Sequence, residues 1–233
     1  LDPNQWRFGR RLIERHLRDG RVEAAVAVAA AYHARFPASY VLGMAHARSL
    51  LAAGRAREAA PVLASLHVLP YEGATEGRAL HRVTELTLAA ETGRAGRVED
   101  ALRHVRAARE WPGHLGAGKP YPADVDESLE DAMQWKLLAG TRRAKDAAAA
   151  LERVAAGAGR STGAGALASA LALRDAGRAA DATRVIARWE AAESDAAVRS
   201  WGRALFDGRA VARPAGNGTL LDPLARLWAA GGV

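Results

Sequence analysis

Apolar residues recur at intervals of three or four along most of this chain. Between positions 22 and 36 the stripe consists of Val22, Ala25, Val26, Ala29, Tyr32 and Phe36. Similar stripes follow Gly54, Gly96 and Gly177. This spacing puts the apolar side chains on one face of an α-helix. Because no convincing run of alternating β-branched residues occurs, the pattern predicts an all-α fold.

The stripes predict helices that come in consecutive pairs. The pairs are 5–19 with 21–36, 39–53 with 55–68, 74–93 with 97–110, 124–139 with 143–156, and 163–176 with 178–192. Another helix is expected at 194–206. Asp222 and Pro223 resemble an N-cap and first helical residue, so they predict a short last helix. Segment 207–221 is either a long loop or a short hairpin, and we expect Trp189, Trp201 and Trp228 to seal this end of the array.

A glycine separates the two helices of each pair within a Gly-Arg-x-x-x-Ala motif. The motif begins at Gly20, Gly54, Gly96 and Gly177, and a degenerate copy is expected near Gly140. Glycine suits the left-handed position that ends a helix, and the alanine allows the second helix to approach the first closely. Proline after the second helix stops it at three places, Pro37, Pro70 and Pro112.

The first two glycines lie 34 residues apart, and this pattern resembles the tetratricopeptide repeat family. The matching residues are Gly20, Ala25 and Pro37 in the first repeat, and Ala47, Gly54 and Ala59 in the second, with Pro70 one place early. The family's early tryptophan and tyrosine are absent from the second repeat, and later helices are longer. The resemblance implies a right-handed α-α superhelix of about five helix pairs. The resemblance covers residues 4–192. With the helices expected after it, we assign residues 1–206 to the array and 207–233 to a loop and capping helix.

A narrower resemblance lies in two connecting segments, residues 69–77 and 107–122. They look like the C-terminal repeat region of certain bacterial multidomain proteins, in which a β-sandwich similar to carbohydrate-binding or mutarotase domains precedes the repeats. This resemblance implies a helper module in a carbohydrate-related protein. It implies no activity for the segment itself.

The charge balance is basic, with a net charge of +7 and a pI near 10.5. Of the 33 basic residues 30 are arginines, spread along the chain among acidic residues. A nucleic-acid groove would instead show clustered bases or stacking aromatics, so no nucleic-acid partner is expected. The lack of cysteine excludes disulfides and zinc–thiolate sites. No segment has the roughly 18 apolar residues of a membrane span, so no membrane partner is expected.

The loop after the third pair nearly matches a phosphate-binding motif, Gly113-x-x-x-x-Gly118-Lys119. Pro120 follows where the motif needs a hydroxyl, and an Arg-rich helix precedes it where the motif needs a strand. We therefore expect an ordered inter-repeat loop. This loop carries Trp111, His114, Lys119 and Tyr121. These side chains could form a contact surface, or Trp111 could simply plug the end of a helix pair.

An acidic cluster comprises Asp124, Asp126, Glu127, Glu130 and Asp131. Paired carboxylates can ligate a metal, but these lie where a helix is expected to begin, and negative charge there complements the helix dipole. We expect capping, with Asp124 as the N-cap. The seven histidines include no pair spaced by four residues on one helix, so neither a metal site nor a cofactor is expected.

The glycine-rich stretch 157–165 contains a literal Gly-x-Ser-x-Gly around Ser161. A nucleophile elbow needs a strand before the serine and a histidine after it, and no histidine follows His114. A flexible joint is the expected reading. The glycosylation pattern at 217–219 is expected to form a tight turn. The sequence thus predicts no catalytic residues.

The first helices of tetratricopeptide pairs line a concave groove, and the family's pattern places Arg7, Arg10 and Arg48 there. A basic groove suits a carboxylate or an acidic peptide, because guanidinium pairs with carboxylate in a two-pronged way. Ordinary solvated arginine is the alternative.

The sequence therefore predicts a non-enzymatic scaffold that binds a protein, a peptide or another domain of the same polypeptide. The alternative is a helical accessory domain of a carbohydrate-active protein. In that case the loop with Trp111, Lys119 and Tyr121 contributes to a sugar site formed mainly by another domain. Compartment and oligomeric state stay open, with the cytoplasm the first expectation.

Overall fold

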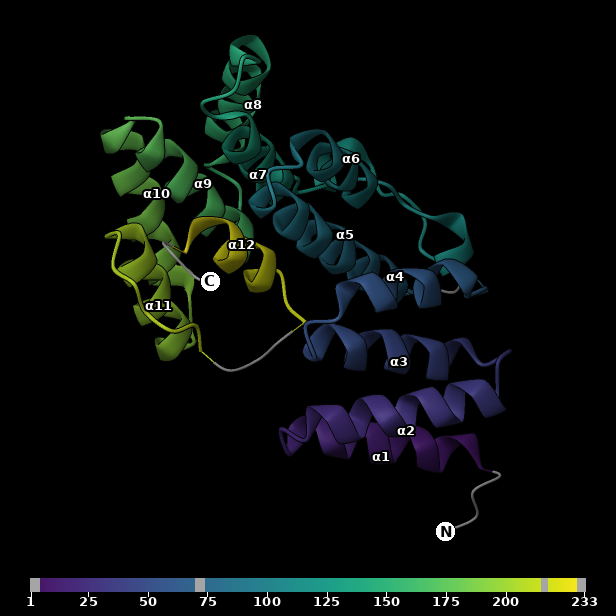
Figure 1. Ribbon diagram of the computed structural model, residues 1–233. Helices are drawn as coiled ribbons and strands as arrows, with labels where there is room; N and C mark the ends of the chain where they lie inside the picture. The colour runs from purple at the N-terminus through teal and green to yellow at the C-terminus, as the bar shows by residue number, and fades with distance from the viewer. Residues whose placement is uncertain (1–4, 70–73, 215–217, 230–233) are drawn as a thin grey trace. The chain divides into compact units, whose positions relative to one another are not determined.

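The computed structural model is built from α-helices (Figure 1). It describes residues 5–69, 74–214 and 218–229, and in these residues it contains twelve α-helices, two short 3₁₀ helices and no strand. The prediction of an all-α fold is confirmed. None of the described helices combines the length and the apolar character that crossing a membrane requires.

The chain divides into two compact units. The first contains residues 1–85, 110–119 and 216–219, and the second contains the rest. The helices of the first unit are α1 (Trp6–Arg18), α2 (Val22–Arg35), α3 (Tyr40–Ala52), α4 (Ala56–Ser65), the first part of α5 (Glu76–Arg94) and the 3₁₀ helix η1 (Gly113–Leu115). Those of the second are the rest of α5, α6 (Val98–Ala108), η2 (Pro122–Asp124), α7 (Ser128–Leu138), α8 (Ala144–Gly157), α9 (Gly163–Asp175), α10 (Ala179–Ala192), α11 (Ala196–Phe206) and α12 (Leu221–Trp228).

In the first unit each helix from α1 to α4 packs against the next one, and α1 also packs against α3. Buried residues at the centre of this packing are Ile13, Ala25, Ala29, Leu42 and Ala45. The approach of α1 to α2 is so close that a Cβ on Gly9 would lie 2.2 Å from the ring of Tyr32. A glycine at position 9 therefore lets the two helices come together.

The second unit repeats this arrangement. Here α7 packs against α8, α8 against α9 and α9 against α10, and α7 also packs against α9. Its core includes Trp189, Trp201 and Trp228, which are 2 %, 3 % and 7 % exposed. A Cβ on Gly202 would lie 2.2 Å from the Trp189 ring, so α11 can pack there only through glycine. The three tryptophans expected at the end of the array thus belong to one core.

The turn glycines adopt the backbone conformation that the sequence predicts. Gly20, Gly54, Gly96 and Gly177 have φ between 69° and 79°, and Gly140 has φ of 77°. Alanines five residues after the four motif glycines are fully buried. Pro37 and Pro112 follow the ends of α2 and α6, while Pro70 lies outside the described residues.

Two predicted helix starts were wrong. The helix expected from 124 begins at Ser128, because Pro122 opens a separate 3₁₀ turn that ends at Asp124. Asp126, not Asp124, accepts a hydrogen bond from the Ser128 backbone N–H at 3.0 Å. The last helix begins at Leu221, so Asp222 lies inside its first turn and pairs with Arg213. In the described part of 207–221 the chain forms no hairpin strand.

Candidate binding site

Two of the three arginines expected in a groove share a neighbourhood in the first unit. Arg10 on α1 donates to Glu14 at 2.7 Å, and Arg48 on α3 donates to Glu76 at the start of α5. Burial lowers the pKa of Arg48, the charge of Glu14 opposes that shift, and the charge of Arg10 adds to it. The first helices thus carry two acid–base pairs close together, and the guanidinium groups already hold carboxylates of this chain.

Arg7 has a different partner. Its guanidinium carbon lies 4.7 Å from the centroid of the Trp6 ring, within the range of a cation–π contact. Its side chain is exposed to solvent. The structure therefore fixes Arg7 against its neighbour in sequence.

The four loop residues singled out from the sequence have separate surroundings. Trp111 is half-buried beneath Arg78, whose guanidinium carbon lies 4.8 Å from the ring centroid. The His114 ring lies 6.4 Å from that of His67. Lys119 is exposed, and Tyr121, which belongs to the second unit, is 82 % exposed. The structure thus half-buries Trp111 beside Arg78 and leaves His114, Lys119 and Tyr121 exposed.

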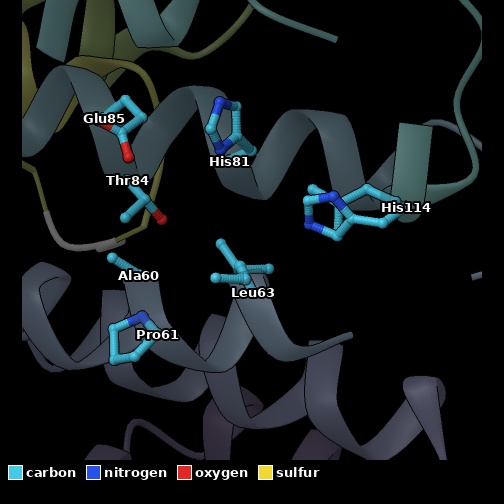
Figure 2. Close-up of a pocket in the computed structure, with 9 residues that line it drawn as sticks. Ala60, Pro61, Leu63, His81, Thr84, Glu85 and His114 are labelled. Atoms are coloured by element: carbon cyan, nitrogen blue, oxygen red, sulfur yellow. The ribbon is translucent and has the colours of Figure 1, made fainter. Parts of the chain in front are cut away.

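A cavity of about 310 Å³ lies between α4 and α5 in the first unit (Figure 2). Its lining includes Ala60, Pro61 and Leu63 from α4, His81, Thr84 and Glu85 from α5, and His114 from η1. In Figure 2 Thr84 of α5 and Leu63 of α4 lie in the space between the two helices, while His81 and Glu85 lie along α5. The cavity thus combines an apolar wall with a wall of hydrogen-bonding groups, a combination typical of small binding sites.

Local sequence explains why this cavity exists. Pro61 and small alanines occupy α4 where it faces α5, and α4 ends at Ser65 rather than at the expected position 68. The extended segment after it is held because the Val68 N–H donates to the His114 carbonyl at 2.8 Å. A Cβ on Gly77 would lie 2.9 Å from the Leu115 carbonyl oxygen, so η1 lies directly on α5. Through η1, the segment after α4 is therefore held close to the first turn of α5 at one end of the cavity.

Sequence reasoning did not find this cavity. Its polar wall follows a helical spacing, since positions 81, 84 and 85 lie on one face of α5. That spacing was the sequence feature that could have indicated the polar wall. The pattern within α5 alone, however, does not indicate that α4 lies opposite this wall. Within the described ranges, no group of three or more histidine and acidic side chains is arranged to hold a metal ion.

The acidic cluster forms structural contacts. Asp131 accepts from Arg109 at 2.8 Å and from Arg153 at 2.7 Å, which ties α6, α7 and α8 together. Burial raises the pKa of Asp126, but hydrogen bonds from Ser128 and Ser161 outweigh this effect and lower it. Asp126 therefore stays charged at neutral pH, and Asp131 joins neighbouring helices through its two arginine partners.

The two glycine-rich motifs lack the surroundings that their chemistry needs. Ser161 is 4 % exposed, follows α8 rather than a strand, and donates to Asp126 at 3.2 Å. It forms a joint between α8 and α9. Likewise residues 117–121 are not helical, whereas a phosphate-binding loop would open an α-helix at Gly118 and Lys119.

Comparison with known proteins gives no relative for this chain. Protein-family models, curated proteins and solved structures were all searched, and none of them matches. Any functional assignment therefore depends on the residues and contacts described above.

Proposed function

We propose that this chain is a non-enzymatic scaffold that binds an acidic segment of a partner protein. We further propose that its hairpins stack as in a tetratricopeptide-like solenoid. Support for the stacking comes from the packing of first helices directly against each other, α1 against α3 and α7 against α9, in addition to their hairpin partners. Such packing lets neighbouring first helices contribute to a shared face, as in a repeat array.

One observation carries the binding proposal: Arg48 on α3 lies near charged groups of two other first helices, α1 and α5. It pairs with Glu76 of α5, and the charges of Arg10 and Glu14 on α1 shift its pKa in opposite directions. Half-buried guanidinium groups bind carboxylates more strongly than fully solvated ones, because less water competes. A carboxylate of the partner would compete with Glu76 for Arg48.

The test is a selection of twelve-residue peptides on the intact chain, followed by calorimetry. We expect the selected peptides to be acidic, and Arg48→Gln to weaken their binding about tenfold, a loss of roughly 1.4 kcal/mol. Arg10→Gln, at an exposed site, provides a second variant that keeps the fold. Arg142→Gln, also exposed but in the second unit, is the matched control for charge. The proposal fails if no peptide binds saturably, or if all three variants weaken binding equally.

A second candidate function is the accessory role in a carbohydrate-related protein. The observation that favours it is Tyr121, which is 82 % exposed and therefore able to stack on a sugar ring. Calorimetry of the chain against a glycan panel tests this role. Saturable binding that Tyr121→Ala abolishes would favour it over the peptide scaffold.

A further inference from the structure

A second cavity, in the second unit, has a basic rim. It encloses about 550 Å³ between the end of α8, α9 and α10. Its apolar floor includes Ala158, Leu173 and Val185, all of them buried. Its rim consists of Arg178, which directly precedes α10, and of Asp181, Arg184 and Arg188 on α10. We call this cavity the arginine groove.

Two of these arginines converge on one carboxylate. Arg178 Nη2 lies 2.7 Å from Asp181 Oδ2, and Arg184 Nη2 donates to Asp181 Oδ1. The hydrogen bonds from Arg178 and then Arg184 lower the pKa of Asp181, so its carboxylate is charged at neutral pH. The arginine groove therefore already binds one oxyanion, the carboxylate of its own residue Asp181.

The third arginine has only neutral acceptors. Arg188 Nη1 donates to the Gly159 carbonyl at 2.5 Å, and Nη2 donates to the carbonyls of Ala158 and Ser161. These bonds satisfy carbonyl groups left open where α8 ends. No carboxylate pairs with Arg188 in the part of the chain that the structure describes.

The rim as a whole has excess positive charge. Among the described residues, the carboxylate besides Asp181 that pairs with a rim arginine is Glu152, whose Oε1 lies 3.5 Å from Arg178 Nη1 and whose side chain is 76 % exposed. Three guanidinium groups thus face two carboxylates, and both carboxylates contact Arg178. Arg184 and Arg188 are four residues apart on α10, a spacing at which like charges repel and destabilise a helix. An anion between them would convert that repulsion into attraction.

We propose that the arginine groove binds an oxyanion, a carboxylate or a phosphate group, between Arg184 and Arg188. Asp181 holds Arg178 at one side, and the apolar floor reduces competition by water. Arg184 is 78 % exposed, so its guanidinium can turn toward a ligand while one of its nitrogens keeps the contact with Asp181. This site uses the second helices of the second unit, so it does not depend on the proposed first-helix scaffold.

The test is a ¹H–¹⁵N NMR titration of the intact chain at low ionic strength, first with inorganic phosphate and separately with tetraglutamate. We expect saturable shifts in the amide signals of α10 and of the end of α8. Arg184→Gln should weaken binding about fivefold or more, whereas Arg142→Gln, an equal charge change at an exposed site elsewhere in this unit, should change it less than about twofold. Asp181→Asn removes the internal competitor and should strengthen binding by up to about fivefold.

The two titrations, with phosphate and with tetraglutamate, also distinguish a free anion from an acidic peptide as the ligand. Saturation by phosphate alone assigns the site to a free anion, and tighter binding of tetraglutamate assigns it to an acidic peptide. Either result supports the proposal. Linear shifts without saturation in both arms overturn it, as does equal weakening by Arg184→Gln and Arg142→Gln. Thermal melting of each variant identifies any loss of fold separately.

Discussion

The imidazole rings of His33 on α2 and His46 on α3 meet nearly edge-on, with their Nδ1 atoms 3.3 Å apart. The ring centroids are 5.6 Å apart and the ring planes lie at 71°. One nitrogen must donate and the other must accept, so this contact accommodates a single proton. Burial lowers the pKa of both histidines, and the charge of His33 lowers that of His46 further.

This pair predicts that acid destabilises the first unit. Because the folded-state pKa of each histidine lies below its unfolded value of 6.5, the unfolded chain binds protons more tightly. The stabilisation is complete above pH 6.5 and is lost as pH falls from 6.5 through the lower folded-state values. Urea unfolding between pH 7.5 and 5.5 measures it. The double variant His33→Asn/His46→Asn should flatten the dependence, whereas His67→Gln, at an exposed histidine, should not. An unchanged slope in the double variant would refute the role of the pair.

Gly9→Ala should destabilise the packing of α1 on α2. The added methyl group would lie 2.2 Å from Tyr32 Cδ1, so the Tyr32 ring or one of the helices must shift. Overpacking of this kind costs roughly 1–3 kcal/mol, although the better helix propensity of alanine offsets up to about 1 kcal/mol. Thermal melting should show a lower Tm. Gly113→Ala is the control, since a Cβ there meets nothing within 4 Å. Equal Tm values for both variants would contradict the close approach.

Asp131→Asn should destabilise the second unit by about 2 kcal/mol, because it leaves two guanidinium groups without their shared carboxylate. The Asp131 side chain is only 11 % exposed and accepts from Arg109 and Arg153. Asp100→Asn is a matched change at a more exposed pair with Arg103, and it should cost less than about 1 kcal/mol. Chemical denaturation of both variants checks this difference. A loss at Asp131 no larger than that at Asp100 would show that the cluster is not structural.

Local patterns were enough to predict the helices. The turn glycines have the expected positive φ, and most helix ends lie within a few residues of the stripes that predict them. The start of α7 was misplaced because the acidic run offered several possible caps, and only the 3₁₀ turn at Pro122 determines that Asp126 is used. The pattern within one helix indicates which face of that helix is buried. It depends only on residues a few positions apart, so it can be recognised from the sequence.

Contacts between helices could not be predicted in this way. His33 and His46 are 13 residues apart, and the search for histidines four residues apart on one helix could not find them. The arginine groove likewise depends on Arg188 reaching the end of α8, about 30 residues earlier in the chain. The arginines of the first helices were found through a family resemblance, which does not indicate that Glu14 and Glu76 already pair with them.

The most direct test of the scaffold is an NMR map of where an acidic peptide binds. The peptide that binds best in the selection is titrated into the ¹⁵N-labelled chain, and the amide shifts are followed residue by residue. The account predicts saturable shifts around Arg10 and Arg48 and at the start of α5. Saturable shifts confined to other surfaces, or no saturable shifts at all, would contradict it.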